Sequence, residues 1–533
     1  MAATRPAGQV TKSTEPAIED AKWPQGSDLT AVNHAVNPSP TFETLFQRTL
    51  ARTPEAVALV DPFNKLRITG QSPRRLTYAQ ADRAISALAA HFVESGLPAH
   101  SVIAVQLANT VEFALTILAA HRAGLVVALI PQLWRQADLV SALNRTSARA
   151  IVTCDRIDGV IHADIAMNAA AEVFSIRHVC GFGAGLPEGM ASLDDAIARG
   201  SRPARVAIQD GRKAAVISFD VTTDGFRAVP RPHLGLIAGG LAISLEADVR
   251  QGSNLMSAFA PTSFGGLACS LAVWLLTGGT LALHHPFDGD VLQQQITELG
   301  CDTLIAPAQL AQRLGERDLA ARLPSLRNVI GMWRAPEQVA SSQPWKTQTA
   351  TLTDVYLFGE AGMFGVRRTA EDGSPALVKS GPHGAPRETF GSSIAGEVLL
   401  TPKGTLGLRG PMVVVAAYAP PPPPSDSLVA QPPRDYVDTE YTARVDRTTG
   451  AISITAPPSG IMAVGGYRFL ANDLQDWSRR LGQGALLTAL PDRLSGHRLA
   501  GRAQDNARAR EAMTELGLNP LMAEAFRDRI GSI

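Results

Sequence analysis

The sequence predicts an α/β protein built from several compact units. Its 533 residues, of which 45% are hydrophobic, correspond to roughly three or four domains at about 150 residues each. Strand and helix patterns alternate in two successive regions, which is typical of parallel sheets covered by helices. A later region has short strand patterns interrupted by glycine and proline, which is typical of a small β-barrel or meander.

The first region follows a stretch without apolar periodicity. Residues 1–40 are rich in Pro, Thr, Gly and Glu and contain no apolar run of signal-peptide length, so we expect a flexible tail. Thr77 stands three residues before Gln80, and this capping box predicts a helix that begins there. Gly96 then offers a left-handed cap at the end of that helix.

The alternation of strands and helices continues from this helix through two regions. The expected elements are strand 102–105, helix 111–123, strand 126–130, strand 215–219, a helix from about 234, strand 254–260, helix 267–276, strand 280–284 and helix 291–299. The segments GEVLLT, MVVVAAY and AISITA predict the β region that follows. Pro420–Pro424 predicts an exposed polyproline loop, and residues 460–533 a short mixed α/β domain.

Charge and cysteine content exclude several function classes. Lys+Arg and Asp+Glu both number 49, so the formal net charge is +0 and no overall field attracts nucleic acid. The most apolar stretch, Leu267–Leu283, is short for a membrane span and contains Gly278, so we expect a buried helix, a turn and a strand. Four widely spaced cysteines indicate neither a disulfide framework nor a metal knuckle, and we expect a cytoplasmic protein.

Taken in order, these segments resemble the adenylate-forming superfamily, which comprises acyl- and aryl-CoA ligases, peptide-synthetase adenylation domains and luciferases. The resemblance covers roughly Thr41 to Arg502 and includes TPEAVALVD, VIAVQLANTVEFALTILAAHRAGLVVALIP, CDTLIAPAQLAQRL and GEVLL. It implies two α/β subdomains and a β subdomain, followed by a shortened C-terminal domain. The implied boundaries are 1–40 for the tail, 41–205, 206–393, 394–456 and 457–533.

The resemblance also implies a chemistry. Such proteins use ATP and Mg²⁺ to convert a carboxylic acid into its adenylate, and a thiol such as that of CoA then displaces AMP. A hydrophobic small-molecule acid, a thiol acceptor and a place in fatty acid metabolism are therefore expected, while the oligomeric state is left open. No catalytic residue can be named, because the resemblance offers no counterpart of the family's late lysine.

The phosphate loop of the family aligns with Phe219–Arg227. Thr222 and Thr223 are kept, Arg227 replaces a lysine, and His233 follows six residues later. The resemblance therefore assigns Thr222, Thr223 and Arg227 to the nucleotide and His233 to the substrate. The loop has lost most of its glycines, and Asp220 and Asp224 add negative charge where phosphates would bind. A working phosphate site and an ordinary turn are both open.

Three further positions follow from the same resemblance. Phe358 and Gly359 align with the adenine-stacking motif, and Glu360 falls two positions before the family's metal-binding glutamate. Glu360 is therefore either a metal ligand or a glutamate on a solvated turn. Tyr441 occupies the position of the ribose-binding carboxylate, and a phenol cannot accept two hydroxyl hydrogen bonds as a carboxylate does. Phe264 either lines an acyl pocket or belongs to the core.

These departures leave two functions open. One is an acid–thiol ligase of the acyl-CoA synthetase type. The other is a catalytically inactive relative, or pseudoenzyme, that binds an acyl compound, a nucleotide or a partner protein through the same scaffold. A folded phosphate cradle facing Glu360 would favour the ligase, and a collapsed cleft would favour binding alone.

Overall fold

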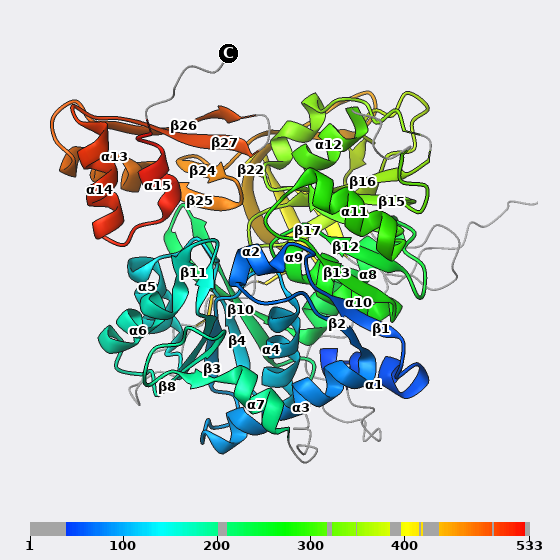
Figure 1. The fold of residues 1–533 in the computed structure, drawn as a ribbon. Coiled ribbons are helices and arrows are strands. Elements are labelled where there is room, and N and C mark those ends of the chain that lie inside the picture. Colours follow the sequence, from blue (N-terminus) through cyan, green and yellow to red (C-terminus); the bar gives the residue numbers. More distant parts are fainter. Residues whose placement is uncertain are drawn as a thin grey trace, which may run out of the picture. The chain divides into compact units, whose positions relative to one another are not determined.

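The computed structural model describes residues 39–200, 210–316, 322–347, 349–383, 396–414, 417–418, 436–492 and 495–527. Nearly all of the expected tail 1–40 and the whole of Pro420–Pro424 lie outside these ranges. The described residues form three large sheets, their accompanying helices and a small C-terminal domain (Figure 1). The predicted α/β class with a β subdomain and an α/β C-terminal domain is confirmed.

The first sheet is mostly parallel and has the strand order β11-β10-β4-β3-β5-β8-β9. Its strands are β3 (Val102–Val105), β4 (Val126–Leu129), β5 (Ala150–Cys154), β8 (His178–Phe182), β9 (Ala191–Ser192), β10 (Ala214–Thr222) and β11 (Gly225–Pro232). The helices that alternate with them are α3 (Tyr78–Glu94), α4 (Val111–Arg122), α5 (Gln136–Thr146), α6 (His162–Glu172) and α7 (Leu193–Arg199). A short hairpin of β6 (Arg156–Ile157) and β7 (Val160–Ile161) follows β5.

The second sheet has the order β17-β16-β15-β14-β12-β13-β1-β2, with antiparallel pairs only at its two edges. Its strands are β1 (Val57–Val60), β2 (Arg75–Thr77), β12 (Asn254–Ser257), β13 (Thr280–Leu283), β14 (Thr303–Pro307), β15 (Asn328–Trp333), β16 (Thr351–Leu357) and β17 (Met363–Arg367). Its helices are α1 (Phe42–Arg52), α2 (Lys65–Thr69), α8 (His233–Glu246), α9 (Phe264–Leu267), α10 (Val273–Thr277), α11 (Gly289–Leu299) and α12 (Ala308–Glu316). The chain forms β1 and β2 of this sheet before it enters the first sheet, and it returns to the second sheet at β12.

The third sheet is antiparallel and has the order β18-β23-β22-β21-β20-β19. Its strands are β18 (Val378–Lys379), β19 (Gly381–His383), β20 (Gly396–Leu400), β21 (Thr405–Arg409), β22 (Val437–Val445) and β23 (Ala451–Ala456). The successive pairing of β19 to β23 makes it a meander. The strand expected for MVVVAAY is wrong for the described Met412–Val414, which form a turn and irregular backbone; two of its residues lie outside the description.

The C-terminal domain consists of two hairpins and three helices. They are β24 (Ile461–Val464), β25 (Tyr467–Leu470), α13 (Ala471–Arg480), β26 (Leu486–Asp492), β27 (Gly496–Arg502), α14 (Asn506–Glu515) and α15 (Pro520–Glu524). Its own core includes Leu474, Leu487 and Met513. The β24–β25 hairpin also contacts the first sheet, since Leu133 N donates to the Tyr467 hydroxyl at 3.2 Å.

Local signals in the sequence agree with the structure where they predict single elements. The helix expected at Thr77 is α3, and the Thr77 and Gln80 side chains cap it reciprocally. The apolar stretch after Leu267 is a buried helix that includes a π-helical turn (Ala268–Ala272), and Gly278 ends it with a φ of 68°. Throughout the described ranges, no helix has the length and apolarity needed to cross a membrane.

Candidate functional site

The segment that the resemblance assigns to the phosphate loop forms a closed antiparallel hairpin. β10 and β11 pair from Phe219 opposite Ala228 to Thr222 opposite Gly225, which leaves only two residues, Thr223 and Asp224, in the turn. A phosphate cradle needs successive backbone N–H groups that converge on one concave site. In a strand, successive N–H groups point to opposite edges, so this segment does not present such a cradle.

The tip of this hairpin is bonded to the third sheet. The Thr223 hydroxyl donates to the two carboxylate oxygens of Glu440 at 3.0 and 2.8 Å. Glu440 has a φ of 62°, a conformation that only a few per cent of non-glycine residues adopt. The Thr222 hydroxyl turns back to the Gly225 carbonyl at 3.2 Å. Both threonine side chains are therefore engaged with protein groups.

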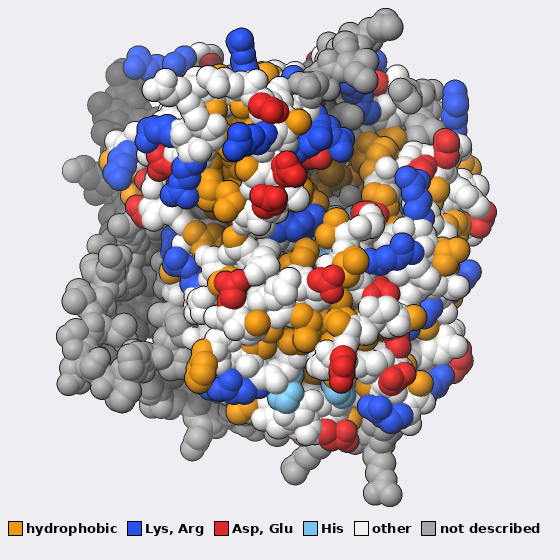
Figure 2. Space-filling view, turned by 60° about the vertical axis from the view of Figure 1, so that its left-hand side comes forward, with side chains coloured by type: hydrophobic (Ala, Val, Ile, Leu, Met, Phe, Trp, Pro, Cys, Tyr) orange, Lys and Arg blue, Asp and Glu red, His pale blue; other side chains and the backbone are white. Residues whose placement is uncertain are grey.

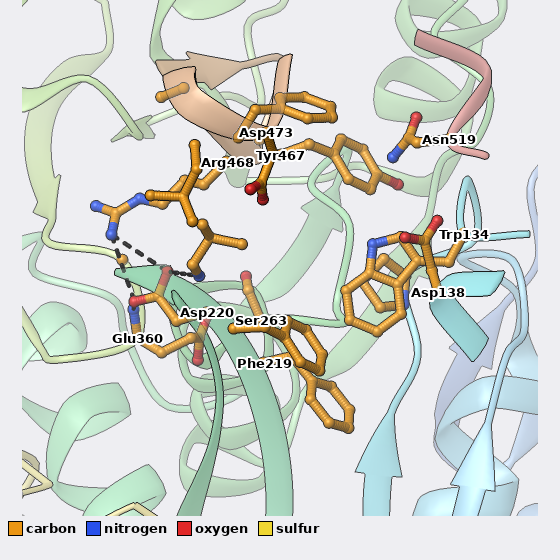
Figure 3. A pocket seen from close by; sticks show the side chains of 18 of the residues that line it. Trp134, Asp138, Phe219, Asp220, Ser263, Glu360, Tyr467, Arg468, Asp473 and Asn519 are labelled. Carbon is orange, nitrogen blue, oxygen red and sulfur yellow. Dashed lines mark hydrogen bonds and ion pairs between the residues drawn. The ribbon is translucent and has the colours of Figure 1, made fainter. Parts of the chain in front are cut away.

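Asp220 joins the hairpin to the C-terminal domain. Its carboxylate accepts from Val221 N at 2.9 Å and Glu360 N at 2.8 Å, and it pairs with Arg468 Nη1 of β25 at 3.2 Å (Figure 3). Arg468 Nη2 donates to the Tyr441 hydroxyl at 2.9 Å. Burial opposes the charged form of Arg468, but Asp220, Tyr441 and Glu360 together outweigh burial and raise the Arg468 pKa. A guanidinium from the C-terminal domain thus lies beside the hairpin.

Glu360 lies in the turn after β16 and is only 5% exposed. Its carboxylate accepts from the Ser218 hydroxyl and from Phe264 N at 2.9 Å. Burial raises the pKa of Glu360 to about 7, although Arg231 acts in the opposite direction. Arg231 is itself buried, donates to the carbonyls of Glu360 and Met412, and lies 3.5 Å above the Phe264 ring. Glu360 therefore belongs to a buried polar cluster.

Two cavities flank the β10–β11 hairpin. The smaller has a volume of 80 Å³ and lies between the hairpin and the third sheet, lined by Arg227, Phe358, Glu360 and Glu440 among others. The larger has a volume of 370 Å³ and lies between the first sheet and the C-terminal domain (Figure 3).

Aromatic side chains dominate the larger cavity. Phe219 and Phe226 stack with ring centroids 5.4 Å apart, and the Trp134 ring lies 5.3 Å from Phe219. Tyr467 and Trp477 line the cavity from the C-terminal domain. A concave, mostly apolar site with a few polar groups is the usual form of a small-molecule pocket.

Comparison with known protein families shows which family this chain belongs to. The sequence profile described as "AMP-binding enzyme" matches residues 46–392. The chain belongs to the AMP-binding enzyme family. The resemblance to adenylate-forming ligases drawn from the sequence motifs is thereby confirmed.

Individual relatives of this AMP-binding family member are distant. It is 26% identical over 322 residues to a 4-chlorobenzoate–CoA ligase from Arthrobacter sp, a match that covers 57% of this chain and 55% of that protein. The chain thus spans about half the length of the curated relatives it matches. Among solved structures, amide bond synthetase McbA from Marinactinospora thermotolerans has a TM-score of 0.66 at 17% identity, covering 91% of this chain and 94% of McbA. An acyl-CoA synthetase from Brucella canis has a TM-score of 0.61 at 19% identity, covering 91% of each chain. These structures share the fold.

The family implies ATP, typically with Mg²⁺, and a nucleotide needs an open surface for its base and free space for its phosphates. Phe358 is only 2% exposed and packs against Phe364 and Tyr441, at centroid distances of 5.6 and 5.3 Å, so little of its ring is open to an adenine. The Arg468 and Asp220 side chains occupy the space directly beside Gly359, where even a Cβ atom would meet them. The described arrangement therefore does not fit a nucleoside triphosphate.

The side chain at the predicted metal position is also engaged with protein groups. Glu360 is already bonded to Ser218 and Phe264, and in the described part of the chain no group of three or more His, Cys, Asp or Glu side chains could hold a metal ion. The metal-ligand role of Glu360 stays a prediction. The alternative of a solvated turn is wrong, because the side chain is buried.

The two residues assigned to the substrate side lie in the core. His233 begins α8, accepts from Phe42 N at 3.3 Å and packs against His121 with ring centroids 4.5 Å apart. Burial lowers the pKa of His233 well below its ordinary value. Phe264 is fully buried under Arg231. Neither side chain lines the 370 Å³ cavity.

The sequence predictions include Gly359 and Glu360, which line this cavity, but not the aromatic and C-terminal residues that line the rest of it. Trp134 and Asp138 follow the parallel strand β4, and ligands of α/β proteins commonly bind beyond the carboxyl ends of such strands. Their position after a predicted strand could therefore have indicated these two residues. Tyr467 and Asn519 come from the C-terminal domain, more than 300 residues later in the chain. No local pattern indicates that these distant segments meet.

Proposed function

We propose that this member of the AMP-binding enzyme family binds a small organic compound in the 370 Å³ cavity without converting it into an adenylate. The observation that carries the proposal is the closed β10–β11 hairpin, which stands where the family's phosphate loop would be. Pockets for drug-sized ligands usually measure about 300 to 1,000 Å³. The larger cavity falls within that range, and the 80 Å³ cavity beside the nucleotide positions falls below it.

Charge supports the same proposal. Asp220, Asp224 and Glu440 line the smaller cavity, whereas a triphosphate is itself strongly negative. At 4 Å, two like charges repel by about 1 to 4 kcal/mol for effective dielectric constants of 80 to 20. Asp220 is neutralised by Arg468, but a triphosphate that recruited Arg468 would release the Asp220 charge beside it. In addition, residues 404–502, which the resemblance covers, contain no lysine that could act late in adenylate formation.

A second candidate is ATP-dependent acid–thiol ligation in the cytoplasm. It is favoured by the similarity to 4-chlorobenzoate–CoA ligase and by the cation Arg227 at the lysine position of the phosphate loop. In this case a hydrophobic carboxylic acid, ATP with Mg²⁺ and a thiol such as CoA would be the substrates, and fatty acid metabolism a plausible setting. The hairpin would then have to open before ATP could bind.

Calorimetric titration with ATP plus Mg²⁺ and with an acyl-adenylate mimic separates the two candidates. We expect no binding tighter than about 1 mM, which corresponds to about −4 kcal/mol, and no pyrophosphate release with a panel of acids. The same titration is made with Thr223→Ala, which releases the hairpin tip from Glu440, and with Thr455→Ala on β23 as a matched surface control. If the hairpin only had to open for ATP to bind, Thr223→Ala should bind ATP more tightly than the control. ATP binding by the unmodified protein, followed by acid-dependent pyrophosphate release, would refute the proposal.

A further inference from the structure

The larger cavity contains a carboxylate that lacks a cationic partner. We propose that this cavity takes an aromatic amine, whose ammonium group pairs with Asp138 while its ring packs against Trp134, Phe219 and Phe226. This inference rests on the proposed ligand-binding function and names the chemical class of the ligand.

Asp138 lies in the first turn of α5 and lines the cavity beside Trp134, near Tyr467 and Asn519 (Figure 3). The hydrogen bond described for its carboxylate comes from Arg135 N at 3.5 Å, the outer limit for such a bond. Within the described chain, no Lys, Arg or His side chain forms an ion pair with it at 4.0 Å or less. A partly buried carboxylate in this situation gains free energy when a ligand supplies a cation.

The neighbouring cation does not fill this role. The Arg135 guanidinium donates instead to the carbonyls of Gln132 and Trp134, at 3.1 and 3.2 Å. Burial raises the pKa of Asp138 to about 6, and Arg135 offsets only part of that effect. At neutral pH the carboxylate is therefore mostly ionised and available to a positively charged group.

The aromatic walls favour the same kind of ligand. Ring faces attract cations through their quadrupole, and this attraction is larger where water is excluded. Trp134 contacts both Phe219 and Phe226, with centroid distances of 5.3 and 5.6 Å, so the rings form one continuous apolar surface next to Asp138. An amine on an aromatic body matches both the charge and this surface.

Most other charged groups of the cavity are already engaged, and the remaining one, Asp473, is an exposed residue in the first turn of α13. Asp220 and Arg468 form an ion pair, and Glu360 accepts two hydrogen bonds. The Arg334 guanidinium lies 4.0 Å from the centre of the Phe259 ring and donates to the Gly465 carbonyl at 2.7 Å. Because Arg334 would attract an acid instead of an amine, the test includes an acid of the same size.

The full chain is titrated by calorimetry, without nucleotide, with phenethylamine, phenethyl alcohol and hydrocinnamate. These probes share an aromatic body and differ in charge. We expect the amine to bind about tenfold or more tightly than the alcohol, and the acid to bind most weakly. Asp138→Asn keeps an acceptor for the helix cap but removes the charge, so it should reduce amine binding to the level of the alcohol and leave alcohol binding unchanged.

The control variant is Asp164→Asn, an exposed acid at the equivalent first turn of α6, which should behave as the unmodified protein. Equal binding of amine and alcohol, preference for the acid, or unchanged amine binding by Asp138→Asn overturns the inference while leaving a ligand-binding cavity. If none of the probes binds, the inference is also overturned. The two proposals can fail separately. The proposed function is tested by titrating the unmodified protein with ATP, whereas the amine inference is tested by titrations that contain no nucleotide.

Discussion

The replacement Glu360→Gln should remove a pH dependence of stability that the native carboxyl creates. Glu360 is buried, and its pKa is raised from an ordinary value of 4.5 to about 7. The folded protein therefore holds this proton more tightly than the unfolded chain does. The resulting stabilisation is fully present below pH 4.5 and is lost as the pH rises through 7.

The size of the effect follows from this difference in pKa. One unit corresponds to about 1.4 kcal/mol, so Glu360 should account for about 3 kcal/mol of unfolding free energy between pH 4.5 and a pH above 7. Glutamine imitates the protonated carboxyl, since its oxygen can accept from Ser218 and Phe264 as the glutamate does. The two proteins should be similarly stable near pH 5, and the variant more stable near pH 8.

Urea unfolding at several pH values, followed by circular dichroism, measures this difference. Asp61 and Asp138, whose pKa values burial also raises to about 6, contribute equally to both proteins and cancel in the comparison. The exposed Glu371→Gln serves as a control and should follow the native profile. Parallel profiles for native protein and Glu360→Gln from pH 5 to pH 8 would refute the reasoning.

Three further substitutions test one buried ion pair of the second sheet and two contacts of the C-terminal domain. Arg368→Leu leaves the buried Asp354 without its cation, which lies 2.7 Å away. The unfolding free energy measured by urea titration should therefore fall by about 3 to 5 kcal/mol, and a loss below about 1 kcal/mol would contradict this. Gly466 has a φ of 107°, which L-residues rarely adopt, and a Cβ atom there would also displace the Arg334 guanidinium. In Gly466→Ala, limited trypsin digestion should therefore release C-terminal fragments faster, and an unchanged pattern would contradict this reasoning. Arg468→Met removes one partner of a largely buried ion pair, so the C-terminal domain should lose about 1 to 3 kcal/mol of stability. Hydrogen exchange measures this loss, and unchanged protection would contradict it.

Much of the fold could be predicted because its signals are local. Thr77 and Gln80 lie three residues apart, and each caps the same helix end, so one short segment determines where α3 begins. The strand predicted at Val102–Val105 is fully buried and flanked by helices, and its apolar run has no competing interpretation. The MVVVAAY segment carries a similar run, yet its described part is irregular, which shows that apolarity alone does not define a strand.

The candidate site depends on contacts that sequence patterns do not report. The sequence indicated that Asp220 adds negative charge to the expected phosphate loop, but its partner Arg468 stands 248 residues later. The hairpin tip is likewise bonded to Glu440, 217 residues from Thr223. Figure 2 shows charges of both signs interspersed with hydrophobic side chains on one face, in keeping with the balanced composition. Composition and motifs could therefore identify the family but not the state of its nucleotide site.

The buried Arg231 has a consequence for how the molecule unfolds. It belongs to a strand of the first sheet, its ring contact is with a helix of the second, and its hydrogen bonds reach the turn after β16 and the segment after β21. Separating any of these parts would leave a guanidinium or a carbonyl in the interior without a partner, which is costly. Residues 39–200, 210–316, 322–347, 349–383 and 396–414 should therefore melt as one cooperative block, while the C-terminal domain, with its separate core, can open first.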